Sequence, residues 1–216
     1  MHVAEIFEHE SMTVRLHYDE DCFSPREYDN VSRMLYSHRD YTLGDGEPDD
    51  RHMEAVERGG FRLLERYLRL CEGAIYFSSL GLGDHSGIWT YLGGGAHACD
   101  PGGWDSGTCG YVYVTRERWD ELCGTEPTEE RVSQAVECEV DEYDKYIRGD
   151  CYGYVIESPD GEEESCWGFI GSEYAEEEAR GAATVMAVEY RERKAEEARE
   201  DAGASMAEAL EAPYAA

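Results

Sequence analysis

The amino-acid sequence predicts an α+β fold, with a mainly antiparallel sheet, packed helices and an acidic C-terminal helix. Short alternating segments rich in β-branched and aromatic residues are interspersed with longer segments of helical periodicity, and turns join several of the short ones. The chain has 216 residues, 41% hydrophobic and 12% aromatic. This is enough for one core domain with an appendage. We expect residues 1–172 to form the core domain and residues 173–216 to form the acidic helix and tail.

Alternation and turn residues predict the strands. The clearest case is a hairpin around Ser158-Pro159-Asp160-Gly161, which has the composition of a tight turn. Glycines and Pro101 exclude regular structure over residues 93–107, and a loop of that length is usually functional or mobile. The expected strands are 13–18, 74–80, 87–92, 110–114, 151–157 and 164–170, with a turn over 81–86.

Apolar spacing and capping residues predict the helices. Thr115 and Thr128 are suitable N-caps, and Gly59-Gly60 weakens the helix that contains it. The expected helices are 52–72, 116–123, 129–147 and 172–199, while residues 27–36 are either a short helix or irregular. In the last helix we expect an inward apolar stripe of Ala179, Ala182, Val185, Met186 and Tyr190. Beyond Gly203 the composition predicts a frayed tail.

Charge is the strongest compositional signal. The chain has 49 acidic and 19 basic residues, a formal net charge of −30. Such a surface repels nucleic acid and anionic membranes and attracts cations and basic proteins. A GC-rich genome or a high-salt cytoplasm would also favour this composition, so the acidity alone does not identify a function.

Other features narrow the cellular context. No window reaches the ~18 apolar residues of a membrane span, and the N-terminus lacks the basic and apolar regions of a signal peptide. We expect a cytoplasmic protein whose eight cysteines are thiols. No Cys-x-x-Cys pair of a zinc ribbon is present. Cys71, Cys138 and Cys166 lie in apolar patterns and are expected in the core.

Five short motifs follow one another along the chain. They are Pro25-Arg26-Glu27-Tyr28-Asp29-Asn30, His38-Arg39-Asp40-Tyr41-Thr42-Leu43-Gly44-Asp45, Asp84-His85-Ser86-Gly87, Trp104-Asp105-Ser106-Gly107, and Tyr152-Gly153-Tyr154 with Ser165-Cys166-Trp167-Gly168-Phe169. Over residues 13–175 this succession resembles a family of uncharacterised proteins common in phages and mobile elements of Gram-positive bacteria. Tyr28 and Asp40 stand where that family has Trp and Arg. The resemblance implies a phage or mobile-element origin, hence a host-cell cytoplasm, and it implies no activity or catalytic residue.

Five motif residues carry side chains that bind divalent metals, namely His38, Asp45, Asp84, His85 and Asp105. If they converge, a metal-bound water could act as nucleophile in a hydrolase. The competing interpretation is structural, because Asp beside Ser-Gly is ordinary turn chemistry. The sequence lacks the G-x-S-x-G motif of serine hydrolases and the glycine-rich loops that bind phosphates.

The acidic helices form the other candidate site. Its residues are Glu129, Glu130, Glu173, Glu176, Glu177 and Glu178. Regularly placed carboxylates can imitate duplex DNA, which carries one charge per ~1.7 Å of axis. We expect a non-enzymatic acidic interaction protein without cofactor, DNA-mimic-like, that inhibits a basic DNA-handling or defence protein of the host and does not bind nucleic acid. A metal-dependent hydrolase is the alternative. The carboxylates could also serve solubility alone.

Overall fold

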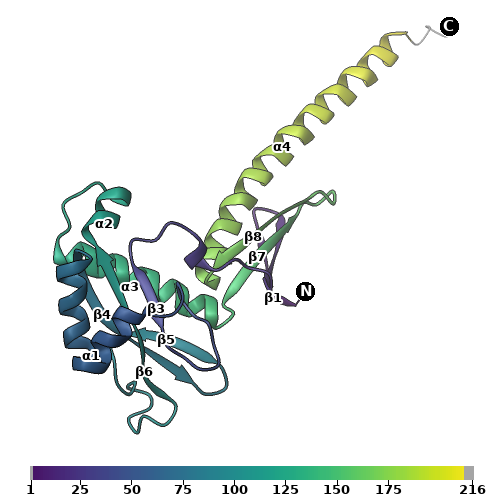
Figure 1. Ribbon diagram of the computed structural model, residues 1–216. Coiled ribbons are helices and arrows are strands. Elements are labelled where there is room, and N and C mark those ends of the chain that lie inside the picture. Colours follow the sequence, from purple (N-terminus) through teal and green to yellow (C-terminus); the bar gives the residue numbers. More distant parts are fainter. Residues whose placement is uncertain (1, 212–216) are drawn as a thin grey trace, which may run out of the picture. The chain divides into compact units, whose positions relative to one another are not determined.

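The computed structural model describes residues 2–211, with side chains described as far as residue 206 (Figure 1). In this part of the chain, two antiparallel four-stranded sheets and four α-helices confirm the predicted α+β class. Packing groups the chain into two compact units: unit 2 is Phe23–Asp150, and unit 1 combines the segments before and after it. The boundary expected after residue 172 rests on composition and stays a prediction.

Unit 1 is a sheet with one helix across one face. Its strands are β1 (Val3–His9), β2 (Met12–Tyr18), β7 (Cys151–Glu157) and β8 (Glu163–Ile170), in the order β1-β2-β7-β8. The residues of β2 alternate, so that Met12, Val14 and Leu16 are buried against helix α4 (Ser172–Glu211). Small side chains let the helix approach the sheet closely, and the buried ones are Ala175, Ala179, Ala183 and Ala187. The β7–β8 hairpin confirms the predicted one, whereas β1 was not predicted.

Helix α4 differs from its prediction in two respects. Its packed stripe includes Met186, with Ala182 and Tyr190 at the edge, but Val185 is 60% exposed and lies outside it. The helix also continues through Gly203 to Glu211, where a frayed tail was expected; the last residues of that tail lie outside the described part. From residue 195 to residue 206 every side chain is exposed, so this part of the helix has no packing of its own.

Unit 2 is a sheet between helices. Its strands are β3 (Arg33–Tyr36), β4 (Ala74–Asp84), β5 (Ile88–Leu92) and β6 (Ser106–Thr115), in the order β3-β6-β4-β5. Three helices, α1 (Asp50–Cys71), α2 (Arg116–Leu122) and α3 (Glu129–Ile147), and the short 3-10 helix η1 (Pro25–Glu27) complete it. The predicted N-caps are confirmed, since the hydroxyls of Thr115 and Thr128 accept from backbone N–H groups of α2 and α3.

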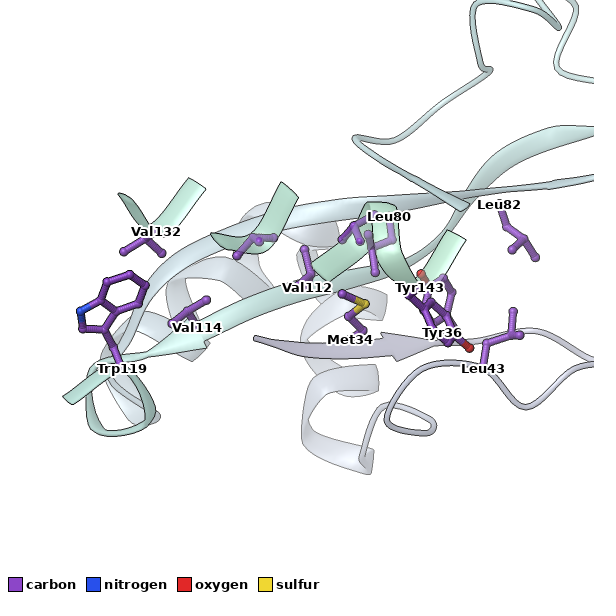
Figure 2. Packing of buried hydrophobic residues seen from close by; sticks show 12 residues of the cluster. Met34, Tyr36, Leu43, Leu80, Leu82, Val112, Val114, Trp119, Val132 and Tyr143 are labelled. Atoms are coloured by element: carbon purple, nitrogen blue, oxygen red, sulfur yellow. The ribbon is translucent and has the colours of Figure 1, made fainter. Parts of the chain in front are cut away.

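Figure 2 shows the core between this sheet and α3, where Val132 lies near Val114 and Trp119, and Tyr143 lies beside Tyr36. The opposite face of the sheet packs on α1 through a second cluster that includes Leu35, Leu64, Leu68, Tyr111 and Tyr113. Met34 and Tyr36 of β3 therefore pack into the core with α3, whereas Leu35 between them packs into the cluster with α1. This alternation makes β3 a strand, where the sequence left a choice between a short helix and an irregular segment.

Helix α1 turns back on itself at Gly59-Gly60, where the backbone is not helical. His52 Nε2 lies 2.6 Å from Glu72 Oε1 although the residues are 20 positions apart. In a straight helix that separation would be about 30 Å. The two glycines therefore reverse the chain, and the expected single helix is a pair of short helices side by side.

Replacing Gly60 with alanine should lower the free energy of unfolding by about 1–3 kcal/mol, the usual cost of a side chain in a backbone region that only glycine occupies. Gly60 has φ 64° and ψ −166°, with open space around it, so the cost is backbone strain and not a clash. Urea denaturation measures it. Gly181→Ala in α4 is the control, because Gly181 has ordinary helical geometry and should gain stability. An unchanged Gly60→Ala protein would contradict the reversal.

Three cysteines expected in the core are exposed: Cys71, Cys138 and Cys166. Cys71 and Cys138 lie on the solvent-facing sides of their helices, whereas Cys166 lies on the edge strand β8, on the side of the sheet that carries Tyr154. Among residues 2–211, none of the helices combines the length and apolar character needed to cross a bilayer.

Candidate functional site

The first two sequence motifs converge on one buried side chain, Arg26, which is 3% exposed. Its guanidinium binds Asp45 through two hydrogen bonds of 3.1 and 2.7 Å, and it donates to Glu139 of α3 at 3.2 Å. Asn30 and the carbonyl of Ser32 accept its other hydrogens at 3.0 and 2.7 Å. Buried charge is tolerated when it is paired and hydrogen-bonded in this way.

Backbone groups satisfy the two carboxylates of this network. Asp45 accepts from the Met34 N–H at 2.7 Å, and Glu139 accepts from the Val31 N–H at 2.7 Å. Burial by itself would lower the pKa of Arg26, but Asp45 and Glu139 outweigh it and hold that pKa above its ordinary value. The network fixes the start of β3 against α3, so Asp45 has a structural task.

The third and fourth motifs meet at the end of the sheet in unit 2. The backbone N–H of Asp84 donates to the carbonyl of Asp105 at 2.8 Å. His85 Nδ1 lies 3.4 Å from Asp105 Oδ2, and both side chains are in solvent, with exposed fractions of 73% and 47%. His38 stacks on the ring of Tyr41, 4.9 Å between centroids. These contacts hold turns in place.

The metal-ligand candidates do not form one cluster in the part of the chain that the structure describes. Asp45 belongs to the Arg26 network, His38 packs on Tyr41, and His85 pairs with Asp105 beside Asp84. Within residues 2–211, no group of three or more His, Cys, Asp or Glu side chains has the arrangement of a metal site. The hydrolase alternative therefore has no preformed ligand set among these residues.

The loop between β5 and β6 is held by the carboxylate of Asp100. It accepts from the Asp105 N–H and the Ser106 hydroxyl, both at 2.9 Å, and from the Trp104 N–H at 3.3 Å. The bond from Asp105 contributes most to lowering the pKa of Asp100 below its ordinary value. Trp104 is 90% exposed at the tip of this loop. The expected irregular segment is therefore an ordered loop.

A buried hydrogen-bonded chain joins the two halves of α1 to the sheet of unit 2. His52 contacts Glu72 through Nε2 and the hydroxyl of Tyr111 through Nδ1, at 2.6 and 2.7 Å. Tyr113 donates to the other oxygen of Glu72 at 3.1 Å, and burial is the main cause that raises the pKa of Tyr113 to about 12. Glu72 and Tyr113 also line a polar pocket of about 690 Å³ with Arg33. Sequence reasoning missed this group because it placed His52 and Glu72 at opposite ends of one helix.

The face of the unit 1 sheet that points away from α4 is named the open face here. The strand registers arrange it as three rows that cross the sheet. The aromatic row is Val3, His17, Gly153 and Trp167; the middle row is Ile6, Arg15, Val155 and Ser165; the acidic row is Glu8, Thr13, Glu157 and Glu163. Solvated sheet faces are normally polar, so the apolar residues of the first two rows are unusual.

Trp167 is the largest side chain of the open face. Its ring covers Gly153 so closely that a Cβ atom at that position would lie 2.1 Å from a ring carbon. The Tyr-Gly-Tyr and Ser-Cys-Trp-Gly-Phe motifs thus belong together, because only glycine lets the indole lie flat on the neighbouring strand. Trp167 remains 37% exposed, Ile6 59% and Val3 46%. This apolar surface is available for contact.

His17 and Arg15 complete the open face between the apolar side chains. Arg15 is paired with Glu157 at 2.6 Å. Burial is the main cause that lowers the pKa of His17, with a further contribution from Arg15. Within the described residues, the buried Nδ1 of His17 has no hydrogen-bond partner, and its ring centroid lies 6.0 Å from that of Trp167. The one arginine of these rows, Arg15, is therefore already paired with a carboxylate of the acidic row.

The acidic residues singled out in the sequence occupy different settings. Glu129 and Glu130 lie exposed in the first turn of α3, where they also stabilise the helix N-terminus. Glu176 is bound to Arg180 at 2.6 Å. The remaining three, Glu173, Glu177 and Glu178, are exposed on α4. In sequence, unit 1 has 23 acidic and 6 basic residues, a net charge of −17, against 26 and 13 in the longer unit 2.

Comparisons of this chain with protein-family models, with curated proteins and with solved structures find no match. The functional assignment rests on the residues described above.

Proposed function

We propose that this protein is a non-enzymatic interaction protein of phage or mobile-element type that binds a basic host protein through unit 1. The open face of the unit 1 sheet supports this proposal best. Its aromatic row, which ends in Trp167, lies near its acidic row, which contains Glu8, Glu157 and Glu163. Protein interfaces combine an aromatic, uncharged centre with a polar rim in this way. The higher charge density of unit 1 adds electrostatic attraction for a basic partner.

The charge per unit length of α4 decides whether this helix alone could imitate DNA toward such a partner. Helix α4 has 12 acidic and 5 basic residues over 40 positions. At 1.5 Å per residue, that is about one net charge per 9 Å, against one per ~1.7 Å in duplex DNA. The helix alone is too sparse to imitate a duplex. A DNA-handling host protein remains our proposed partner class. It would contact the acidic row of the open face, while the exposed carboxylates in the first turns of α4 would add attraction at longer range.

Neutralising the exposed carboxylates of α4 should weaken binding to a captured host partner. The variant is Glu173→Gln/Glu177→Gln/Glu178→Gln, and the expected result is a slower association rate with a smaller dependence on salt, because steering by exposed charge is screened over about 8 Å at physiological ionic strength. Stopped-flow or surface-based kinetics measures both quantities.

The matched control removes three equally exposed carboxylates from unit 2, in the variant Glu47→Gln/Glu57→Gln/Glu117→Gln. It changes the net charge by the same amount. Equal effects of the two variants would mean that only total charge matters, and the proposed role of unit 1 would be lost.

A further inference from the structure

The second half of α1 carries a local excess of positive charge on a very acidic protein. Residues 61–71 contain Arg62, Arg66 and Arg69 and one acid, Glu65. Arg69 is paired with Glu65 at 2.9 Å, whereas Arg62 and Arg66 form no ion pair or hydrogen bond within residues 2–211. They are one helical turn apart, where like charges destabilise a helix. In a chain with 49 acidic residues, two adjacent arginines without a counter-charge need an explanation.

Exposed leucines accompany these arginines. Leu63 is 36% exposed and Leu70 is 73% exposed. Leu70, the three arginines and Glu65 line a shallow hollow of about 320 Å³. We call Arg62, Leu63, Arg66 and Leu70 the basic face of α1. At physiological ionic strength charges are screened beyond about 8 Å, so these local arginines, and not the net charge of −30, determine what binds here. The fitting partner is an acidic segment with apolar side chains.

The end of α4 is such a segment. Residues 195–211 have six acidic residues and one basic residue, Arg199. All side chains from 195 to 206 are exposed, including Met206 at 66%. A lone helix of about this length is marginal in water unless it packs on something. Residues 195–206 therefore lack a packing partner within the described part of the chain, while Arg62 and Arg66 of the basic face lack a counter-charge there.

We propose that the acidic end of α4 of one copy docks on the basic face of α1 of a second copy. Glu196, Glu200 and Asp201 supply the charges that Arg62 and Arg66 lack, and Met206 supplies an apolar contact for the exposed leucines. The net repulsion between two acidic chains keeps this association weak and concentration-dependent. The proposal is independent of the host partner, because it uses neither the open face nor the first turns of α4.

Light scattering of the full chain across a concentration series tests it. The apparent mass should rise above the 24.4 kDa of one chain as concentration increases. Arg62→Glu/Arg66→Glu should return the protein to 24.4 kDa at every concentration. Arg131→Glu is the control, since Arg131 also lies without an ion pair in the described residues but has no second arginine on α3, and it should associate like the original protein.

A labelled peptide of residues 195–211 provides a second readout that does not depend on dimer mass. Fluorescence anisotropy should show saturable binding to the full chain and at least tenfold weaker binding to Arg62→Glu/Arg66→Glu. A mass of 24.4 kDa at all concentrations together with no peptide binding overturns the proposal. Association that survives the double charge reversal overturns it as well, since it would use another surface.

Discussion

Arg26→Met should lower the free energy of unfolding by about 3 kcal/mol, a large fraction of the total stability of a typical domain. The substitution keeps the length of the side chain but leaves two carboxylates without their cation. Measured costs for breaking buried ion pairs run to about 5 kcal/mol. We expect the lower value because the side chains of Asp45 and Glu139 are 21% and 15% exposed and retain some water. Urea denaturation followed by tryptophan fluorescence, to which the buried Trp119 of unit 2 contributes, measures the change.

Arg118→Met is the matched control for Arg26→Met. Arg118 also pairs with two carboxylates, Asp29 and Glu121, but its side chain is 33% exposed. Exposed pairs contribute about 0–1 kcal/mol. If the two substitutions cost the same, the first two motifs would not be the structural network described here. Adding Glu139→Gln to Arg26→Met should recover part of the loss, because one uncompensated charge is removed.

Trp167→Ala should weaken binding to the host partner about 30-fold, which corresponds to the ~2 kcal/mol of a central aromatic contact residue. Trp167 fits this role because its ring is held flat over Gly153 and loses little freedom on binding. Isothermal titration calorimetry with the captured partner measures the loss. Trp167→Phe keeps an aromatic ring over Gly153 and should retain most of the affinity.

Trp104→Ala serves as the control for Trp167→Ala. Trp104 is more exposed, at 90%, but lies on a loop of unit 2. We expect unchanged affinity. A circular dichroism melt of each variant separates a loss of binding from a loss of folding. If Trp104→Ala weakens binding and Trp167→Ala does not, the partner contacts the β5–β6 loop and the open face is not the interface.

Local signals predicted much of the fold. The N-cap Thr128 marked the start of α3, and Val132, Val136 and Tyr143 of that helix face the core. The turn at Ser158–Gly161 set the β7–β8 hairpin. These features depend on contacts between residues close in sequence, which a pattern can record.

The features that were missed depend on contacts between distant residues. Strand β1 forms because its backbone pairs with β2, although its own side chains are mostly exposed. The residues of β3 show no alternation of apolar and polar side chains, because both faces of this strand are buried. Leu35 packs into the cluster with α1, and Tyr36 packs into the cluster with α3. The reversal in α1 comes from Gly59-Gly60, which the sequence marked only as a weak point.

The candidate site was less predictable than the fold. The sequence suggested Asp45 as a metal ligand, but its carboxylate pairs with Arg26. The role of Gly153 in Tyr-Gly-Tyr, which leaves space for the ring of Trp167, could not be predicted. The three rows of the open face appear only once the register of four strands is known. The acidic helices were visible from composition, and their proposed role stays a prediction.

The most direct test of the central claim is capture of host proteins by the tagged full chain from a nuclease-treated lysate, at about 0.1 M and 0.5 M salt. We expect a near-stoichiometric basic, DNA-handling protein that is retained at the lower salt concentration, weakened at the higher one, and lost with Trp167→Ala. Capture of no protein by the original chain, or equal capture by Trp167→Ala, would contradict the account.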